Sequence, residues 1–230
     1  GSHWIPGFPA SIQCSTPLRL AFCAPAQNGR RPHFRKRVCR VAVSQSEAAA
    51  RDSRYKWLVL QIVMIGTMMG ALDSSIVNVS VPRIMADFGS GVDEIEWVVT
   101  GYMLAFATLM PLTAWLGNRI GHKALYIASL LVFTLGSALC GLAWDLPSLI
   151  VARVIQALGG GAVTPTGMAM IAEVFPPRER GKAMGYWGLG IIMGPAFGPT
   201  LGGYLTHTLG WRSIFLVNLP VGVIGMLLAS

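Results

Sequence analysis

The sequence predicts an all-α membrane protein with six transmembrane helices, and three observations lead to that fold class. First, 53% of the 230 residues are hydrophobic and only 12% are charged, which is more apolar than a soluble domain of average composition. Second, six apolar runs approach or exceed the roughly 20 residues that cross about 30 Å of hydrocarbon as a helix. Third, lysine and arginine gather in the segments on one side of these runs.

Each apolar run predicts one helix, because few or no charged residues interrupt it. The sixth run reaches the end of the sequence without a polar flank, so we expect the sequence to be the N-terminal part of a longer protein. The predicted helices cover residues 57–82, 97–116, 124–144, 147–172, 183–205 and 213–230.

The basic residues predict the orientation of these helices. Short loops rich in lysine and arginine stay in the cytoplasm, and eight such residues lie on the side of the N-terminus against two on the other side. We therefore expect a cytoplasmic N-terminus. The net charge of +8 reflects this asymmetry and the N-terminal segment, so we expect no nucleic-acid partner. The eight are Arg51, Arg54, Lys56, Arg119, Lys123, Arg178, Arg180 and Lys182, and the two are Arg83 and Arg212.

Residues 1–54 form a basic N-terminal extension that we expect to be disordered and to lie outside the functional fold at residues 55–230. Residues 1–46 contain seven lysines or arginines and no acid. Three interpretations stay open: an organellar transit peptide, a patch for nucleic acid or anionic lipid, and a tag remnant or wrongly assigned start. The opening Gly-Ser-His, without an initiator methionine, favours the last.

The sequence offers no motif for metal, cofactor or enzymatic chemistry. Its four cysteines form no CxxC pair and lack a histidine at zinc-site spacing, so we predict neither metal nor cofactor. The apolar runs contain no H-E-x-x-H, no paired acids and no Ser/His pair at helical spacing. We therefore do not expect an enzyme.

An acid lies inside the first apolar run, in the stretch LDSSIVNVSVP at residues 72–82. The serines of this stretch are typical of hydrogen bonds that join membrane helices, but an ionisable residue at such depth is a functional candidate by default. Asp73 is therefore the first candidate for a functional site. Asn78, about 140° from Asp73 around the helix, is a candidate for lining a substrate cavity.

The fourth run carries a charge of the opposite sign. By helical rise, Arg153 lies about 9 Å and Asp73 about 13 Å from the outer ends of their runs, so the two depths nearly agree. If the first and fourth helices are neighbours, Asp73 and Arg153 can neutralise each other, with Gln156 one turn further along and facing the same cavity. A purely structural ion pair remains the alternative.

The fifth run contains a glycine at every fourth position and two prolines. This small-residue spacing leaves a flat face that permits close helix packing, and each proline removes a backbone hydrogen bond and tends to bend the helix. We expect a tightly packed, bent helix with a conformational role. The residues are Gly190, Gly194, Gly198 and Gly202, with Pro195 and Pro199.

The connection between the second and third runs, AWLGNRIGHKAL at residues 114–125, predicts a tight cytoplasmic turn. Gly121 permits the turn, and Arg119 and Lys123 satisfy the positive-inside rule. Taken alone, this stretch does not identify a function.

Together these stretches resemble the major facilitator superfamily, and most closely its fourteen-spanner multidrug:proton antiporter branch. LDSSIVNVSVP is similar to the branch's first-helix signature, Arg153 and Gln156 match the fourth-helix motif, and GIIMGPAFGPTLGG resembles the antiporter motif of the fifth helix. WRSIFLVNLPVG, at residues 211–222, resembles the stretch that begins the sixth helix.

The loop resembles the pattern G-x-L-A-D-R-x-G-R-K, with Arg119, Gly121 and Lys123 in place. It departs from the pattern at three positions: Ala114 replaces the first glycine, Asn118 the acid, and His122 the second arginine. Loss of the acid puts in doubt any charge clamp that the motif forms in relatives.

The resemblance implies the N-terminal six-helix bundle of a transporter, built from two inverted three-helix repeats, in a bacterial inner (plasma) membrane. It also implies a missing C-terminal half of the same chain, because substrate sites in such folds lie between two halves. The implied partners are the lipid bilayer, protons and a small amphipathic substrate.

Three functions are compatible with these features. The first is proton-driven efflux of drugs or other amphipathic compounds, in which protonation of Asp73 frees the pair with Arg153 and shifts the balance between outward and inward states. The second keeps the fold but moves one specific metabolite. The third is a membrane-embedded binding or scaffold module that transports nothing.

Overall fold

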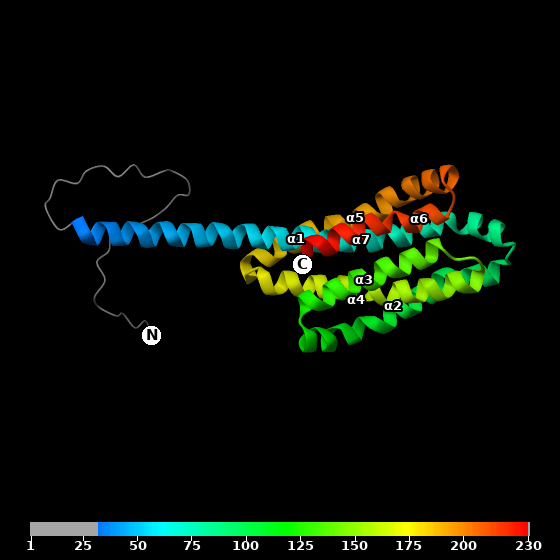
Figure 1. Cartoon of the computed structure of the whole chain (residues 1–230), viewed down its shortest axis with the longest axis horizontal. Coiled ribbons are helices and arrows are strands. Elements are labelled where there is room, and N and C mark those ends of the chain that lie inside the picture. The colour runs from blue at the N-terminus through cyan, green and yellow to red at the C-terminus, as the bar shows by residue number, and fades with distance from the viewer. Residues whose placement is uncertain (1–31, 230) are drawn as a thin grey trace, which may run out of the picture. The chain divides into compact units, whose positions relative to one another are not determined.

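The computed structural model describes residues 32–229, with side chains from residue 54 onwards (Figure 1). Every regular element in this part of the chain is a helix. The chain divides into two compact units, residues 1–45 and residues 46–230. The helices are α1 (Pro32–Phe88), α2 (Val92–Ile120), α3 (His122–Gly141), α4 (Leu146–Val174), α5 (Pro177–Thr208), α6 (Arg212–Leu216) and α7 (Asn218–Ala229).

The predicted fold class, an all-α membrane protein, is confirmed by these elements. Five helical segments of the described chain are long and apolar enough to cross a membrane. The fifth predicted span lies in α5, which has 32 residues but is less apolar because glycines and prolines interrupt its hydrophobic residues. The five segments are Arg54–Phe88, Val92–Ile120, His122–Gly141, Leu146–Val174 and Arg212–Ala229.

The helix boundaries differ from the predicted ones in a consistent direction. Helices continue past the apolar residues into polar flanks, because hydrogen bonding within the helix does not stop at the hydrocarbon edge. α1 thus continues through Pro82 to Phe88, and it begins at Pro32. Residues 32–54, which we expected to be disordered, are therefore helical, in line with the strong helix formers in EAAAR. Predictions on residues 1–31 lie outside the described residues.

The sixth predicted span forms one helical segment, Arg212–Ala229. α6 and α7 meet in it at Val217, whose backbone is helical and donates to the carbonyl oxygen of Ser213 at 3.1 Å. One further boundary was predicted wrongly. The third helix ends at Gly141, and Trp144 lies in the connection to α4. The start of α4 is fixed by a capping box in which Asp145 accepts a hydrogen bond from the backbone N–H of Ser148 at 2.9 Å.

The helices α3 and α4 pack with their backbones in close contact, and α2 packs on α4 (Figure 1). A Cβ added at Gly136 of α3 would lie 2.5 Å from Cα of Gln156. A Cβ added at Gly161 of α4 would lie 2.7 Å from the carbonyl oxygen of Phe106 on α2. Glycine is required at both contacts, and this packing fixes the position of Gln156 relative to α3.

The glycines of α5 face α1. An added Cβ would meet Met64 at Gly190, Ala71 at Gly194, Ser75 at Gly198 and Ile76 at Gly202. The two prolines, Pro195 and Pro199, lie on the exposed side of the same helix. The bend predicted from these prolines stays a prediction. The packing places α5 along the helix that carries Asp73.

Candidate functional site

Asp73 and Arg153 form a buried ion pair. Nη1 of Arg153 donates to Oδ2 of Asp73 at 2.7 Å. The two side chains are 1% and 2% exposed, respectively. Such a pair is stable only if both groups are further hydrogen-bonded, because each charge loses its hydration on burial.

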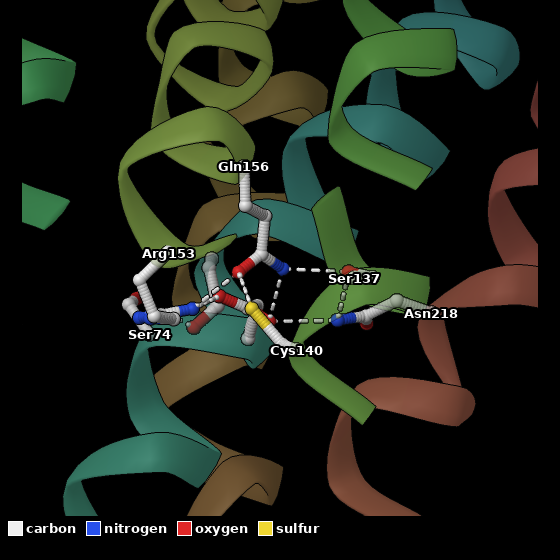
Figure 2. Close-up of polar contacts among 8 residues, drawn as sticks. Ser74, Ser137, Cys140, Arg153, Gln156 and Asn218 are labelled. Carbon is white, nitrogen blue, oxygen red and sulfur yellow. Dashed lines mark hydrogen bonds and ion pairs between the residues drawn. The ribbon is translucent and has the colours of Figure 1, made fainter. Parts of the chain in front are cut away.

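Two amide side chains complete the hydrogen bonding of Asp73. Figure 2 shows these amides, Gln156 and Asn218, on either side of Ser137. Oδ1 of Asp73 accepts from Nε2 of Gln156 at 2.8 Å and from Nδ2 of Asn218 at 2.7 Å. Gln156 also donates to the hydroxyl of Ser137 at 2.6 Å, and Oε1 of Gln156 accepts from Nη1 of Arg153 at 2.6 Å. Side chains of α1, α4 and α7 thus meet at one carboxylate, and α3 joins the network through Ser137.

This hydrogen-bond pattern suits the ionised form of Asp73. An ionised carboxylate only accepts hydrogen bonds, and all three neighbours of Asp73 present N–H donors. The amide of Gln156 is also fully used, because Oε1 lies 3.7 Å from the Sγ donor of Cys140 in addition to its contact with Arg153. The network therefore holds a charged acid at low exposure.

Aromatic rings flank the guanidinium of Arg153. Its Cζ lies 4.2 Å from the ring centroid of Tyr102 and 5.6 Å from that of Phe215. Nε of Arg153 has no hydrogen-bond partner among the described residues. Cation–π attraction to the rings supplements the ion pair, and such attraction is strongest when water is excluded.

A cavity of about 230 Å³ lies beside the network. Its lining comes from α1, α2, α3, α4 and α5, and no lysine, arginine, aspartate or glutamate contributes to it. The wall is apolar and aromatic with a few hydroxyl groups, which suits a flat, largely uncharged ligand surface. The lining includes Tyr102, Phe106 and Phe133, with the hydroxyls of Thr67, Ser74 and Thr164.

Comparison with known proteins identifies the family. A family model described as the Major Facilitator Superfamily matches residues 63–230. The chain belongs to this superfamily. The solved proton:xylose symporter XylE superimposes with a TM-score of 0.69 at 16% identity, over 77% of this chain and 45% of that one. A bacterial homologue of the human lysosomal transporter Spinster superimposes with a TM-score of 0.61 at 21% identity, over 76% and 42%. The structural likeness shows the fold, and the chain is a transporter-family protein rather than an enzyme-family one.

The names of curated relatives of this superfamily member state different substrates. The riboflavin transporter RibZ of Clostridioides difficile is 40% identical over 76% of this chain and 38% of its own length. A multidrug resistance protein B homologue of Mycobacterium tuberculosis is 42% identical over 74% and 31%. The multidrug export protein EmrB of Haemophilus influenzae is 37% identical over 72% and 32%. The chain thus spans about a third of the length of these relatives.

The remaining predicted residues of this superfamily member lie away from the ion pair. Asn78 is exposed on α1. At the α2–α3 connection Asn118 and Arg119 are exposed, and Gly121 has a φ of 86°, which glycine adopts without strain. The connection also holds Lys123.

Where the family pattern has its second arginine, His122 places Nδ1 2.7 Å from Oε1 of Glu173, at the far end of α4. The connection between α2 and α3 therefore contacts the end of α4 through this histidine instead of an arginine.

Sequence reasoning missed four members of the site: Asn218, Ser137, Cys140 and Tyr102. Asn218 gave a usable signal, because it is an amide inside the otherwise apolar sixth run. Ser137 and Cys140 gave none, since small polar residues are common in membrane helices. In the part of the chain with described side chains, no group of three or more His, Cys, Asp or Glu could hold a metal ion.

Proposed function

We propose that the protein is a proton-coupled secondary transporter that exports flat, amphipathic aromatic compounds. The observation that carries this proposal is the buried ion pair of Asp73 and Arg153 beside an aromatic cavity. A proton-driven carrier needs a group that gains and loses a proton inside the membrane, and Asp73 is the buried acid of this bundle.

The geometry suggests where the proton binds. Oδ1 of Asp73 accepts two amide hydrogen bonds, whereas Oδ2 accepts one from Arg153. A proton on Oδ2 places an O–H donor against the N–H donor of Arg153 and so displaces one hydrogen-bond partner. A proton on Oδ1 would instead stand against two N–H donors, those of Gln156 and Asn218. Protonation at Oδ2 therefore releases Arg153 while Gln156 and Asn218 keep their contacts with Asp73.

Release of Arg153 changes the balance between conformations. Asp73 lies on α1 and Arg153 on α4, so the ion pair ties two helices together when the acid is charged. A transporter that alternates between outward and inward states responds to a proton only if the two states differ in their affinity for it. We assign this difference in proton affinity to the ion pair between Asp73 of α1 and Arg153 of α4.

The rest of the transporter follows from the same proposal. The chain is the N-terminal six-helix part, made of two inverted three-helix repeats, of a fourteen-spanner multidrug:proton antiporter, and a C-terminal half of the same polypeptide completes the substrate site. Residues 55–230 form this part, and residues 1–54 are an extension to it. The N-terminus is cytoplasmic and the membrane is a bacterial inner membrane, in keeping with the basic residues on that side.

A second candidate is transport of one flat metabolite such as a flavin. Two observations favour it: the 40% identical relative is named a riboflavin transporter, and the cavity has no charged lining residue that would select cations. Ethidium and riboflavin discriminate between the candidates, because both are flat and aromatic but only ethidium is a lipophilic cation.

The test uses the complete polypeptide that contains this chain, reconstituted in proteoliposomes. Ethidium added to acid-loaded vesicles should drive proton release, and Asp73→Asn should abolish it. Glu96→Gln is the matched control, since Glu96 is an exposed acid of α2 and should leave proton release unchanged. Ethidium-driven proton release by Asp73→Asn would overturn the coupling role, and release driven by riboflavin alone would favour the second candidate.

A further inference from the structure

Tyr102 of α2 belongs to both the ion-pair network and the cavity. The guanidinium of Arg153 lies over its ring, 4.2 Å from the centroid, and the same side chain lines the cavity. Asp73 and Arg153 do not line the cavity themselves. The ring of Tyr102 is buried and stacks on Phe106, another lining residue, with centroids 5.9 Å apart and planes at 28°.

We propose that Tyr102 transmits the occupancy of the cavity to the ion pair, as a positioning residue for Arg153. The inference rests on the proposed function and specifies how ligand and proton compete in it. No direct contact between ligand and Asp73 is required, because the ring of Tyr102 contacts Arg153 and also lines the cavity.

The competition follows from what supports Arg153 in each state. With Asp73 ionised, the carboxylate neutralises the guanidinium. With Asp73 protonated, the guanidinium keeps only its contact with Gln156 and the faces of Tyr102 and Phe215, and cation–π attraction is then the main stabilisation of a desolvated cation. The ring of Tyr102 is consequently held in place most firmly when the acid is protonated.

A flat ligand that shifts the Tyr102 ring removes this support. Its binding therefore favours the state in which Asp73 is charged and holds Arg153 itself. By thermodynamic reciprocity, protonation of Asp73 must weaken ligand binding by the same factor. The coupling between proton and ligand is therefore negative, as an antiporter requires, since binding of each weakens binding of the other.

No other titratable group of the described chain connects Asp73 to the cavity, so we assign the coupling to Arg153 and Tyr102. Among the described residues, the charged or titratable groups facing Asp73 are Arg153 from α4, Tyr102 from α2 and Cys140 from α3. α7 contributes the neutral amide of Asn218, and α5 faces α1 with glycines. The thiol of Cys140 points to Gln156 rather than to the cavity.

The test measures the dissociation constant of ethidium by fluorescence, for the complete polypeptide in detergent, at pH 6 and pH 8. Wild type should bind roughly tenfold more weakly at pH 6, a ratio that corresponds to about 1.4 kcal/mol and lies between the values for an exposed and a desolvated cation–π contact. Tyr102→Leu should bring the ratio of the two constants close to one. Tyr102→Phe, which keeps the ring, should preserve it. Ile191→Ala, the control on α5 in the same cavity wall, should raise both constants and leave their ratio unchanged.

Gly160 supplies a second route that does not depend on the stability of Tyr102→Leu. A Cβ at Gly160 would lie 3.0 Å from Oη of Tyr102, so Gly160→Ala should displace the ring and lower the ratio. Adding Tyr102→Phe removes that hydroxyl and should restore the ratio. This rescue is not expected if Tyr102 has a merely structural role.

The outcomes separate the two proposals. A wild-type ratio of one overturns the proposed proton coupling and this inference with it. A wild-type ratio near ten that persists in Tyr102→Leu overturns the role of Tyr102 and leaves proton coupling standing, as does an unchanged ratio in Gly160→Ala.

Discussion

Asn218 and Asp73, 145 positions apart in the sequence, are joined by a hydrogen bond of 2.7 Å from Nδ2 to Oδ1. Asn218 is the first residue of α7 and lies within the helical segment Arg212–Ala229. The carboxylate of α1 is thus hydrogen-bonded to the last membrane segment of the described chain. Asn218 also lies 3.3 Å from the hydroxyl of Ser137 on α3.

Asn218→Leu should destabilise the bundle, because a buried carboxylate loses one of three donors. The cost of leaving a buried polar group short of a partner is about 1–3 kcal/mol, and more for a charged one. Melting temperature in detergent measures the effect. Asn78→Leu is the control, since Asn78 is an exposed amide on α1. Equal melting temperatures for the two variants would contradict the role of Asn218.

Removing one charge of the ion pair should cost more than removing both. Arg153→Gln leaves Asp73 without a cation, at a cost of about 3–5 kcal/mol. Combining it with Asp73→Asn should restore stability towards wild type, because no unpaired charge remains.

The double-mutant cycle has its own control. Asp73→Asn combined with Arg119→Gln, whose side chain lies over Trp115 near the α2–α3 connection, should give additive losses within about 0.5 kcal/mol. Additive losses for Asp73 and Arg153 as well would mean that the two charges do not interact.

Gly194→Ala should destabilise the contact between α5 and α1. The added Cβ would lie 2.6 Å from the backbone carbon of Ala71, which cannot move aside as a side chain can. Gly203 is the matched control on the same helix, because a Cβ there meets nothing within 4 Å. Gly203→Ala should be neutral or stabilising by up to about 1 kcal/mol, from helix propensity. The melting temperature should therefore fall for Gly194→Ala and stay equal or rise for Gly203→Ala. An equal shift in both variants would contradict the packed glycine face.

The capping box of α4 predicts that the thermal stability of the protein falls in acid solution. Hydrogen bonds from the hydroxyl and the backbone N–H of Ser148 lower the pKa of Asp145. A lowered folded pKa contributes stability that is present above the ordinary aspartate value of about 3.9 and is lost as pH falls through the lowered one. Ser148→Ala should therefore reduce the loss of thermal stability between pH 5 and strongly acid solution. An identical acid profile for wild type and Ser148→Ala would count against this cap.

The meeting of Asp73 and Arg153 could be predicted from sequence because buried charges need partners, and helical rise placed both at similar depth. Tyr102 and Ser137 could not be predicted in the same way. An aromatic or a serine in an apolar run is equally compatible with lipid exposure, core packing or a functional contact, and only the packing of α2 and α3 on α4 decides between these.

The glycine spacing of α5, in contrast, predicted that one face of the helix packs closely on a neighbour. This could be predicted because residues four positions apart lie on the same face of any α-helix. Which neighbour it faces, α1, depends on the whole bundle.

In the proposed function, Asp73 is the group whose proton is exchanged for ligand. Isothermal titration of ethidium into the complete polypeptide, in two buffers of different ionisation enthalpy at each of several pH values from 7 downwards, counts the protons released on binding. Wild type should show a net release that approaches one proton per ligand as the pH is lowered from 7, and Asp73→Asn should show none at any pH. Equal release by wild type and Asp73→Asn would contradict it.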